Sequence, residues 1–284
     1  MARLLRGAPV AQALTLSLKP RVEALRDRGV VATLAVVRVG EEASDLSYER
    51  AARRRMDAVG IATKGIALPA DCSQAELTDA IDRVNEDADI HGCLILRPLP
   101  RTLDERAACA ALDVAKDVDG VTAGSLYGMF ANRRVGFSPC TAEAVMKLLD
   151  YYGVELAGAK VTVIGRSLVI GRPVSMLLLA ADATPTLCHT HTKELAVTCR
   201  DADVVVVAAG HAKVVGAAAV RAGQVIVDVG TNWDEEAGTL VGDVDFDAVE
   251  PKVAAITPVP GGVGAVTTAI LAKHVVEAAE GLIS

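Results

Sequence analysis

The sequence has few aromatic residues and no concentration of basic ones. Only 3% of its 284 residues are aromatic, although 51% are hydrophobic. A core made of Ala, Val, Leu and Ile is typical of parallel sheets covered by helices. The formal net charge is -7 and no basic block occurs. Because nucleic acids and anionic membrane surfaces are bound by clustered positive charge, we expect neither among the partners.

Long apolar runs and paired cysteines are also missing. No apolar run reaches the roughly 18 residues that a membrane-spanning helix needs, and residues 1–10 lack the hydrophobic segment of a signal peptide. We therefore expect a cytoplasmic protein. The six cysteines have no CxxC spacing, so we expect free thiols in a reducing compartment. His189 and His191 have no third ligand nearby in the sequence, and no metal site is expected.

Residues 161–173 have the pattern of a strand, a glycine turn and a helix. A β-branched run ends at Gly165, and Gly171 opens a segment with helical apolar spacing. Glycines let the backbone approach a phosphate, and a helix N-terminus favours negative charge. The spacing differs from G-x-G-x-x-G, and two glycines alone are weak evidence. Arg166 and Ser167 would suit the 2′-phosphate of NADP, although the motif is equally compatible with a surface arginine.

Strands and helices alternate along the whole chain, which predicts the α/β class with two open, mainly parallel sheets. We expect a first domain over residues 1–139, to which a closing helix at 266–284 returns, and a Rossmann-type nucleotide-binding domain over 140–265. The expected strands are 31–39, 61–68, 92–96, 161–164, 184–188, 204–208, 224–229 and 253–256. The main expected helices are 10–28, 44–59, 73–85, 103–112, 141–152 and 263–279.

Motifs spread over the whole chain resemble those of the FolD family. They are Gly40…Tyr48, Pro98-Leu99-Pro100, Lys116-Asp117-Val118-Asp119-Gly120, Pro139-Cys140-Thr141, Gly165-Arg166-Ser167…Gly171-Arg172-Pro173, Asp228-Val229-Gly230, Gly242-Asp243-Val244 and Thr257-Pro258-Val259-Pro260-Gly261-Gly262-Val263-Gly264. That family comprises methylenetetrahydrofolate dehydrogenases of one-carbon metabolism, usually bifunctional with methenyltetrahydrofolate cyclohydrolase. The resemblance implies two α/β domains with a cleft between them, a reduced folate as substrate, and a homodimer.

The resemblance also implies the site residues. Tyr48 and Asp119 would be catalytic, and Asp117 beside the second is expected to be structural. The substrate-binding set would be Tyr48, Leu96, Pro98, Pro100, Asp119, Pro260, Gly261 and Gly262. The cofactor-binding set would be Gly165, Arg166, Ser167, Ile170, Gly171, His189, Thr190, Ala209, Gly210, Val229, Gly230 and Thr231. Arg166 together with Thr190 favours NADP, and use of NAD stays open.

Five positions depart from the family pattern. Ala142, Ala265 and Val266 are small and apolar and are expected to adjust packing near the cleft, and two others bear on the chemistry. The family's lysine, four residues after the tyrosine, is Ala52 here, and its glutamine before Pro-Leu-Pro is Leu96. A guanidinium cannot serve as a base at neutral pH, and Arg97 would point to the other side of an extended segment from Leu96.

Hydride transfer needs positioning and a cofactor, whereas hydrolysis needs a group that moves a proton. We therefore expect an NADP-dependent methylenetetrahydrofolate dehydrogenase with weak or absent cyclohydrolase activity. One alternative is a fully bifunctional enzyme in which an arginine, Arg53 or Arg97, or a relocated side chain replaces the lysine. The other is a non-catalytic folate- or nucleotide-binding relative.

Overall fold

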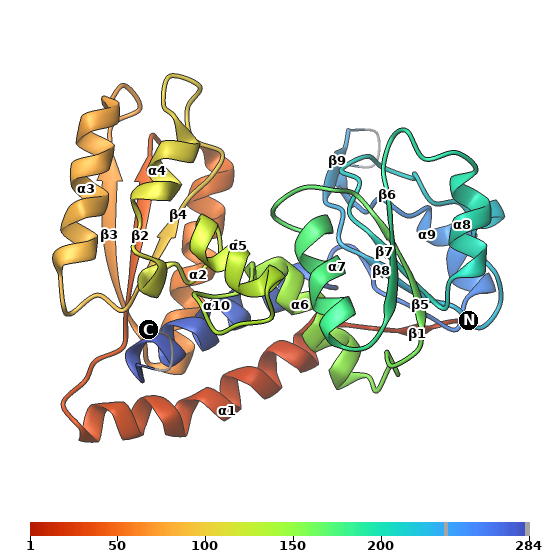
Figure 1. Ribbon diagram of the computed structural model, residues 1–284, viewed down its shortest axis with the longest axis horizontal. Helices are drawn as coiled ribbons and strands as arrows, with labels where there is room; N and C mark the ends of the chain where they lie inside the picture. Colours follow the sequence, from red (N-terminus) through yellow and green to blue (C-terminus); the bar gives the residue numbers. More distant parts are fainter. Residues whose placement is uncertain (236–237, 282–284) are drawn as a thin grey trace. The chain divides into compact units, whose positions relative to one another are not determined.

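The computed structural model describes residues 1–235 and 238–281 (Figure 1). The chain groups into two compact units, which we name by their sheets. The three-stranded unit contains Gln12–Cys140 and the chain from Thr268 on, and the six-stranded unit contains Met1–Ala11 and Thr141–Thr267. The boundaries fall within α1 (Gly7–Asp27), at the start of α6 (Cys140–Tyr151) and within α10 (Gly264–Ala279). Residues 282–284 of the expected closing helix lie outside the described residues.

In the three-stranded unit all strands are parallel. The order is β3 (Ala62–Leu68), β2 (Thr33–Val39), β4 (Gly92–Ile95), with β2 in the centre. Nearly every residue of β2 and β4 is buried, as expected for strands covered on both faces. Figure 1 shows the strands side by side with helices packed around them. These helices include α2 (Ala43–Val59), α3 (Gln74–Glu86), α4 (Glu105–Ala111) and α5 (Ala123–Phe130).

Local sequence signals account for the ends of α2 and α3. Gly60 adopts the left-handed conformation with φ of 92° and donates its N–H to the last turn of α2. Ser73 begins α3 with a capping box, because its hydroxyl accepts from the N–H of Glu76 and that side chain accepts from the N–H of Ser73. The glycine cap fixes the C-terminal end of α2, the helix that carries both Tyr48 and Ala52.

The sheet of the six-stranded unit is parallel throughout. Its order is β1 (Arg3–Leu4), β11 (Ala255–Ile256), β8 (Val225–Asp228), β7 (Val204–Val207), β5 (Lys160–Ile164), β6 (Thr184–Cys188). Two helices, α7 (Gly171–Ala180) and α8 (Leu195–Asp201), follow β5 and β6, and Figure 1 shows them on opposite sides of the sheet. A small antiparallel hairpin, β9 (Asn232–Asp234) and β10 (Thr239–Val241), follows β8, and the short α9 (Phe246–Val249) comes after it.

The predicted α/β class with mainly parallel sheets is confirmed, and three details differ from the prediction. Residues 1–11 were assigned to the first domain, but β1 pairs with β11 through Arg3 and Ala255, which places them in the six-stranded unit. The helix α5 and the β9–β10 hairpin were not predicted. A two-residue edge strand carries too little pattern to be found without its partner. Within the described residues no helix combines the length and apolarity needed to cross a membrane.

Candidate active site

The turn between β5 and α7 closes tightly on itself. Gly165 has φ of 121°, which an L side chain rarely adopts, and a Cβ there would collide with the carbonyl oxygen of Ala208 at the end of β7. A Cβ at Gly171 would collide with the carbonyl oxygen of Gly165. Both positions therefore require glycine, and the turn presents bare backbone at the carboxyl end of the sheet. This cradle fits the phosphates of a dinucleotide.

The side chains predicted to grip the cofactor have different local roles. The Ser167 hydroxyl accepts from the N–H of Ile170 at 3.1 Å, which fixes the entry to α7. After β6, Nδ1 of His189 accepts from the N–H of His191 at 3.1 Å, so this imidazole holds its own turn. Arg166 and Thr190 are exposed. The turns are thus fixed by Ser167 and His189, and the two side chains expected at the adenosine ribose remain accessible.

Asp243 organises the turn that follows β7. Its Oδ2 accepts from the N–H groups of Ala209 and Gly210 at 2.6 and 2.8 Å, and its Oδ1 accepts from Asn232 Nδ2 at 2.9 Å. The Asp243 side chain is fully buried. The two N–H groups are therefore bonded to the protein itself, so Ala209 and Gly210 would shape a cofactor site without donating to the ligand.

A second buried carboxylate, Asp228, ends β8 and binds the same region. It accepts from the N–H groups of Gly230, Asp243 and Val244 at 2.9–3.0 Å. Burial raises the pKa of Asp228 to about 6, although these N–H groups lower it. Asp228 and Asp243 were not among the predicted site residues. The signal that could have found them is their place in the Asp228-Val229-Gly230 and Gly242-Asp243-Val244 motifs.

One cavity of the six-stranded unit is lined by residues from both the predicted cofactor-binding set and the predicted substrate-binding set. Its volume is about 310 Å³. The predicted residues that line it are Val229, Gly230, Thr231, Pro260, Gly261 and Gly262. The first three were expected on the cofactor side and the last three on the substrate side. They come together because β8 and β11 are parallel neighbours in the sheet. The segments that follow these two strands therefore leave the same carboxyl edge side by side.

The three-stranded unit brings together Tyr48 from α2, Arg97 after β4, and Asp119 after the short helix η1 (Val114–Lys116). Arg97 Nη2 lies 3.3 Å from Asp119 Oδ2. Burial raises the pKa of the Tyr48 hydroxyl well above its usual range, Asp119 and Cys140 raise it further, and Arg97 opposes them. Arg97, expected on the other side of the segment from Leu96, thus faces Asp119.

The turn that carries Asp119 is fixed from two sides. Asp117 is fully buried and accepts from the N–H groups of Val121 and Thr122 at 2.9 and 2.7 Å, which confirms its structural role. The carbonyl oxygen of Val118 lies 3.2 Å from the Cys140 thiol and 2.8 Å from Nδ1 of the buried His274. Burial raises the pKa of Asp119 above its usual value, while Arg97 opposes this effect.

The positions of the two departures that bear on the chemistry are both closed. Ala52, one helical turn after Tyr48, is fully buried, and Leu96 is 4% exposed. Arg53 does not replace a lysine here, because its guanidinium binds Glu49 at 2.7 Å and Thr63 at 2.9 Å. Among the described residues, the titratable groups that act on the pKa of Tyr48 are Asp119, Cys140 and Arg97, and none of them is an amine.

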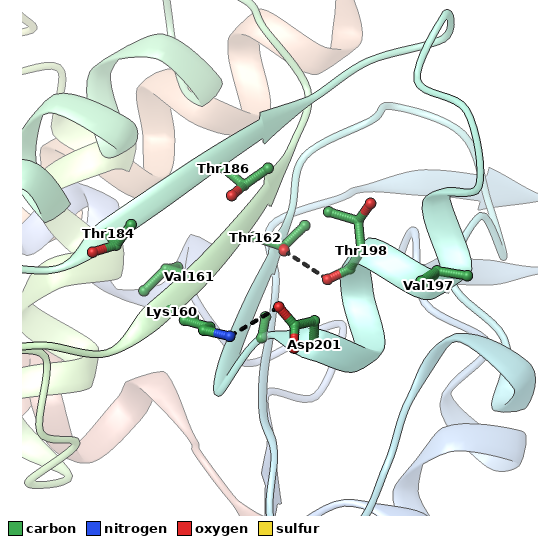
Figure 2. A pocket seen from close by; sticks show the side chains of 9 residues that line it. Lys160, Val161, Thr162, Thr184, Thr186, Val197, Thr198 and Asp201 are labelled. Carbon is green, nitrogen blue, oxygen red and sulfur yellow. Dashed lines mark hydrogen bonds and ion pairs between the residues drawn. The ribbon is translucent and has the colours of Figure 1, made fainter.

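A further cavity of about 400 Å³ lies against β5, β6 and α8 (Figure 2). It contains an ion pair between Lys160 Nζ and Asp201 Oδ2 at 3.0 Å, and the Thr162 hydroxyl donates to the carbonyl of Thr198 at 3.2 Å. Lys160 and Thr184 begin their strands. Ligands of open parallel sheets bind at the carboxyl ends of the strands, so this cavity is not the candidate site.

The fold and the glycine turn define a two-unit α/β protein with a dinucleotide-binding sheet, and comparisons with known proteins agree. Residues 139–282 match the NAD(P)-binding domain of tetrahydrofolate dehydrogenase/cyclohydrolase, and residues 5–119 match its catalytic domain. The chain is 47% identical over 281 residues to the bifunctional protein FolD of Carboxydothermus hydrogenoformans, covering 99% of this chain and 98% of that protein.

Solved structures show the same likeness. The bifunctional FolD of Campylobacter jejuni has a TM-score of 0.96 at 35% identity, with 100% of both chains covered. FolD of Trypanosoma brucei, complexed with NADP cofactor and inhibitor, has a TM-score of 0.92 at 34% identity, covering 99% of this chain and 98% of that one. The chain therefore belongs to the tetrahydrofolate dehydrogenase/cyclohydrolase (FolD) family, and its cofactor is a nicotinamide dinucleotide.

Proposed function

We propose that this protein is an NADP-dependent methylenetetrahydrofolate dehydrogenase with little or no cyclohydrolase activity. The observation that carries the proposal is the pair of closed positions beside Tyr48: Ala52 is fully buried and Leu96 is 4% exposed. Both are apolar, so neither can move a proton. The motif residues assigned to the cofactor, from Gly165 to Gly171, are present.

The dehydrogenase reaction needs little from these side chains beyond positioning. When bound, the nicotinamide accepts a hydride from the one-carbon bridge of 5,10-methylenetetrahydrofolate. Tyr48 packs against and orients the folate rings, while Asp119 accepts from the N–H donors of the pterin. Leu96, Pro98 and Pro100 shape the folate side. Pro260, Gly261 and Gly262 allow close backbone approach.

Preference for NADP rests on the two accessible side chains of the six-stranded unit. A guanidinium binds a phosphate through charge-assisted hydrogen bonds, and Arg166 is exposed directly after the glycine turn. Thr190 follows the next strand and is also exposed. Their positions support recognition of the 2′-phosphate. Ser167 with Ile170, and His189 with His191, hold the surrounding turns through their hydrogen bonds.

Hydrolysis of the methenyl product requires a group that accepts a proton from water. The raised pKa of Tyr48 keeps its hydroxyl protonated at neutral pH. Arg97 is permanently charged, and Asp119 is already paired with it at 3.3 Å. A separate cyclohydrolase must then consume the product. We also propose that the protein is cytoplasmic, and that it is a homodimer, as the family resemblance implies.

The test measures both half-reactions on the wild type and on an Ala52→Lys, Leu96→Gln double variant. The wild type is expected to reduce NADP faster than NAD with methylenetetrahydrofolate, and to leave the decay of methenyltetrahydrofolate absorbance at its buffer rate. The double variant is expected to accelerate that decay. An Ala51→Lys, Leu96→Gln variant, which puts the amine on another face of α2, serves as the matched control.

A fully bifunctional enzyme is the second candidate, because the similar FolD proteins of known structure and sequence are named bifunctional. Decay of the methenyl compound in proportion to the amount of wild-type enzyme would establish it and would refute the single-activity proposal. If the wild type reduces neither NADP nor NAD with this substrate, the dehydrogenase assignment itself fails.

A further inference from the structure

Arg97 has a polar atom that the protein itself does not satisfy. Two carboxylates hold its guanidinium: Nη2 lies 3.3 Å from Asp119 Oδ2, and Nη1 lies 3.7 Å from Glu105 Oε1. Glu105 is itself fixed, because its Oε2 accepts from the N–H of Leu99 at 2.9 Å. Between these contacts Nε is buried and, among the described residues, has no hydrogen-bond partner.

A buried N–H without a partner is costly, and native proteins rarely leave one. The side chain is held by its two carboxylates, so it cannot easily turn Nε to solvent. Its neighbours are the residues assigned to the substrate: Leu96 and Pro98 adjoin it in the chain, and its charge acts on Tyr48. An acceptor that arrives with the substrate would satisfy this N–H.

The Arg97–Asp119 pair matches the edge of a pterin ring. That edge carries an amino group and a ring N–H next to a carbonyl oxygen. A carboxylate accepts from the two donors, and a guanidinium beside it donates to the carbonyl. Neither residue alone could satisfy all three groups of the edge.

We propose that Arg97 binds the pterin of the reduced folate, donating its Nε–H to the ring carbonyl while Nη2 keeps Asp119 placed as the acceptor for the ring N–H groups. This inference rests on the proposed function and adds a substrate contact to it. It also accounts for a positive charge beside Tyr48 that cannot take part in proton transfer, because the guanidinium stays charged.

The charge of Arg97 has a second effect, on the protonation of Asp119. Among the described residues, the groups that interact electrostatically with Asp119 are Arg97, Asp117, Tyr48, Cys109 and Cys140, with Glu105 bound to Arg97 on its other side. Burial raises the pKa of Asp119 and Arg97 lowers it. Removing Arg97 therefore raises the pKa further, and the charged acceptor is lost as the pH falls.

The experiment compares Arg97→Leu, Arg97→Lys and the exposed control Arg106→Leu on α4, by kcat and KM for methylenetetrahydrofolate at saturating NADP over about pH 6 to 8. Arg97→Leu is expected to raise KM about tenfold at neutral pH with kcat within about twofold, because binding is lost equally in ground and transition states. Its KM should rise further as the pH falls.

Arg97→Lys lacks the Nε–H but keeps a cation near Asp119. Its KM should therefore be higher than that of the wild type, with the same dependence on pH. Arg106→Leu should match the wild type.

A wild-type KM in Arg97→Leu overturns the inference. If the KM of Arg97→Leu is raised but depends on pH as in the wild type, Arg97 does not control the protonation of Asp119. If Arg97→Leu does not fold, as judged by NADP binding and urea unfolding, Arg97→Lys carries the test, and a wild-type KM there overturns the Nε–H contact. Inactivity of the wild type would instead refute the proposed function.

Discussion

The two units build their candidate sites from different material. In the six-stranded unit the site is backbone: Gly165 and Gly171 close the first turn, and buried Asp228 and Asp243 tie down the next loops through their N–H groups. In the three-stranded unit the site consists of side chains, with Tyr48, Arg97 and Asp119 meeting from three separate segments.

This difference explains where a family can change its chemistry. A backbone cradle fails when any of its glycines changes, so its motif is rigid. A side-chain site keeps its shape when one group is exchanged for another of suitable size. The substitutions at Ala52 and Leu96, which remove the groups suited to proton transfer, lie in the three-stranded unit, whereas the small apolar departures Ala142, Ala265 and Val266 lie in the six-stranded unit. Nucleotide binding and folate chemistry can thus diverge separately within one chain.

The largest effect is expected from Gly171→Ala, which tests whether the nucleotide site depends on backbone. The new Cβ would collide with the carbonyl oxygen of Gly165, and overpacking of this kind costs about 3 kcal/mol. We expect that loss in urea unfolding and a strong decrease in NADP affinity. Gly216→Ala is the control, because nothing lies within 4 Å of its Cβ position. Equal stability of the two variants would remove the basis of the comparison.

The next effect concerns Asp228 and the pH. Its pKa rises from 3.8 to about 6 on folding, so the folded state binds more protons between these values. The contribution of Asp228 to the free energy of unfolding is therefore fully present at low pH. It decreases as the pH rises from about 4 to about 6, by up to about 3 kcal/mol at about 1.4 kcal/mol per pH unit.

The measurement for Asp228 is urea unfolding of the wild type and Asp228→Asn across this pH range. Asparagine does not titrate at this position. The free energy of unfolding of the wild type should therefore fall relative to that of Asp228→Asn as the pH rises. A difference independent of pH would show that Asp228 is already ionised in the folded protein at low pH.

The smallest effects compare the ion pairs of one carboxylate from each unit. In the three-stranded unit, Glu49 bonds Arg38 at 3.0 Å and Arg53 at 2.7 Å with side chains largely covered. Burial raises the pKa of Glu49, but the hydrogen bonds from the two arginines outweigh it and leave this pKa below its usual value. Glu49→Gln should cost about 2 kcal/mol. Asp201→Asn breaks the exposed pair with Lys160 and should cost no more than about 0.5 kcal/mol. Urea unfolding measures both, and a larger loss for Asp201→Asn would reverse the ranking.

Much of the fold could be predicted because it follows local pattern. The strand at 184–188 was predicted with the bounds it has, and α2 ends at Gly60 as its glycine signal indicated. Pattern failed where an element depends on a distant partner. β1 has two residues and exists through its pairing with β11, and α5 has too few turns for a clear apolar period.

The candidate site divides in the same way. The glycine turn was predictable, because a strand, two glycines and a helix lie consecutively in the chain. The pairing of Arg97 with Asp119 could not be predicted, because β4 ends at Ile95 and the two residues lie in separate segments. The bonds from Asp243 to Ala209 and Gly210 join segments more than 30 residues apart, and no spacing rule covers them.

The sequence by itself determined the α/β class, the nucleotide turn, the family, and the absence of the lysine and glutamine, because each is a property of neighbouring residues or of motif order. Only the tertiary structure decided that Arg97 faces Asp119, that Arg53 is bound elsewhere, and that two buried aspartates hold the loops of the six-stranded unit. These are contacts between segments remote in the chain, and folding creates them.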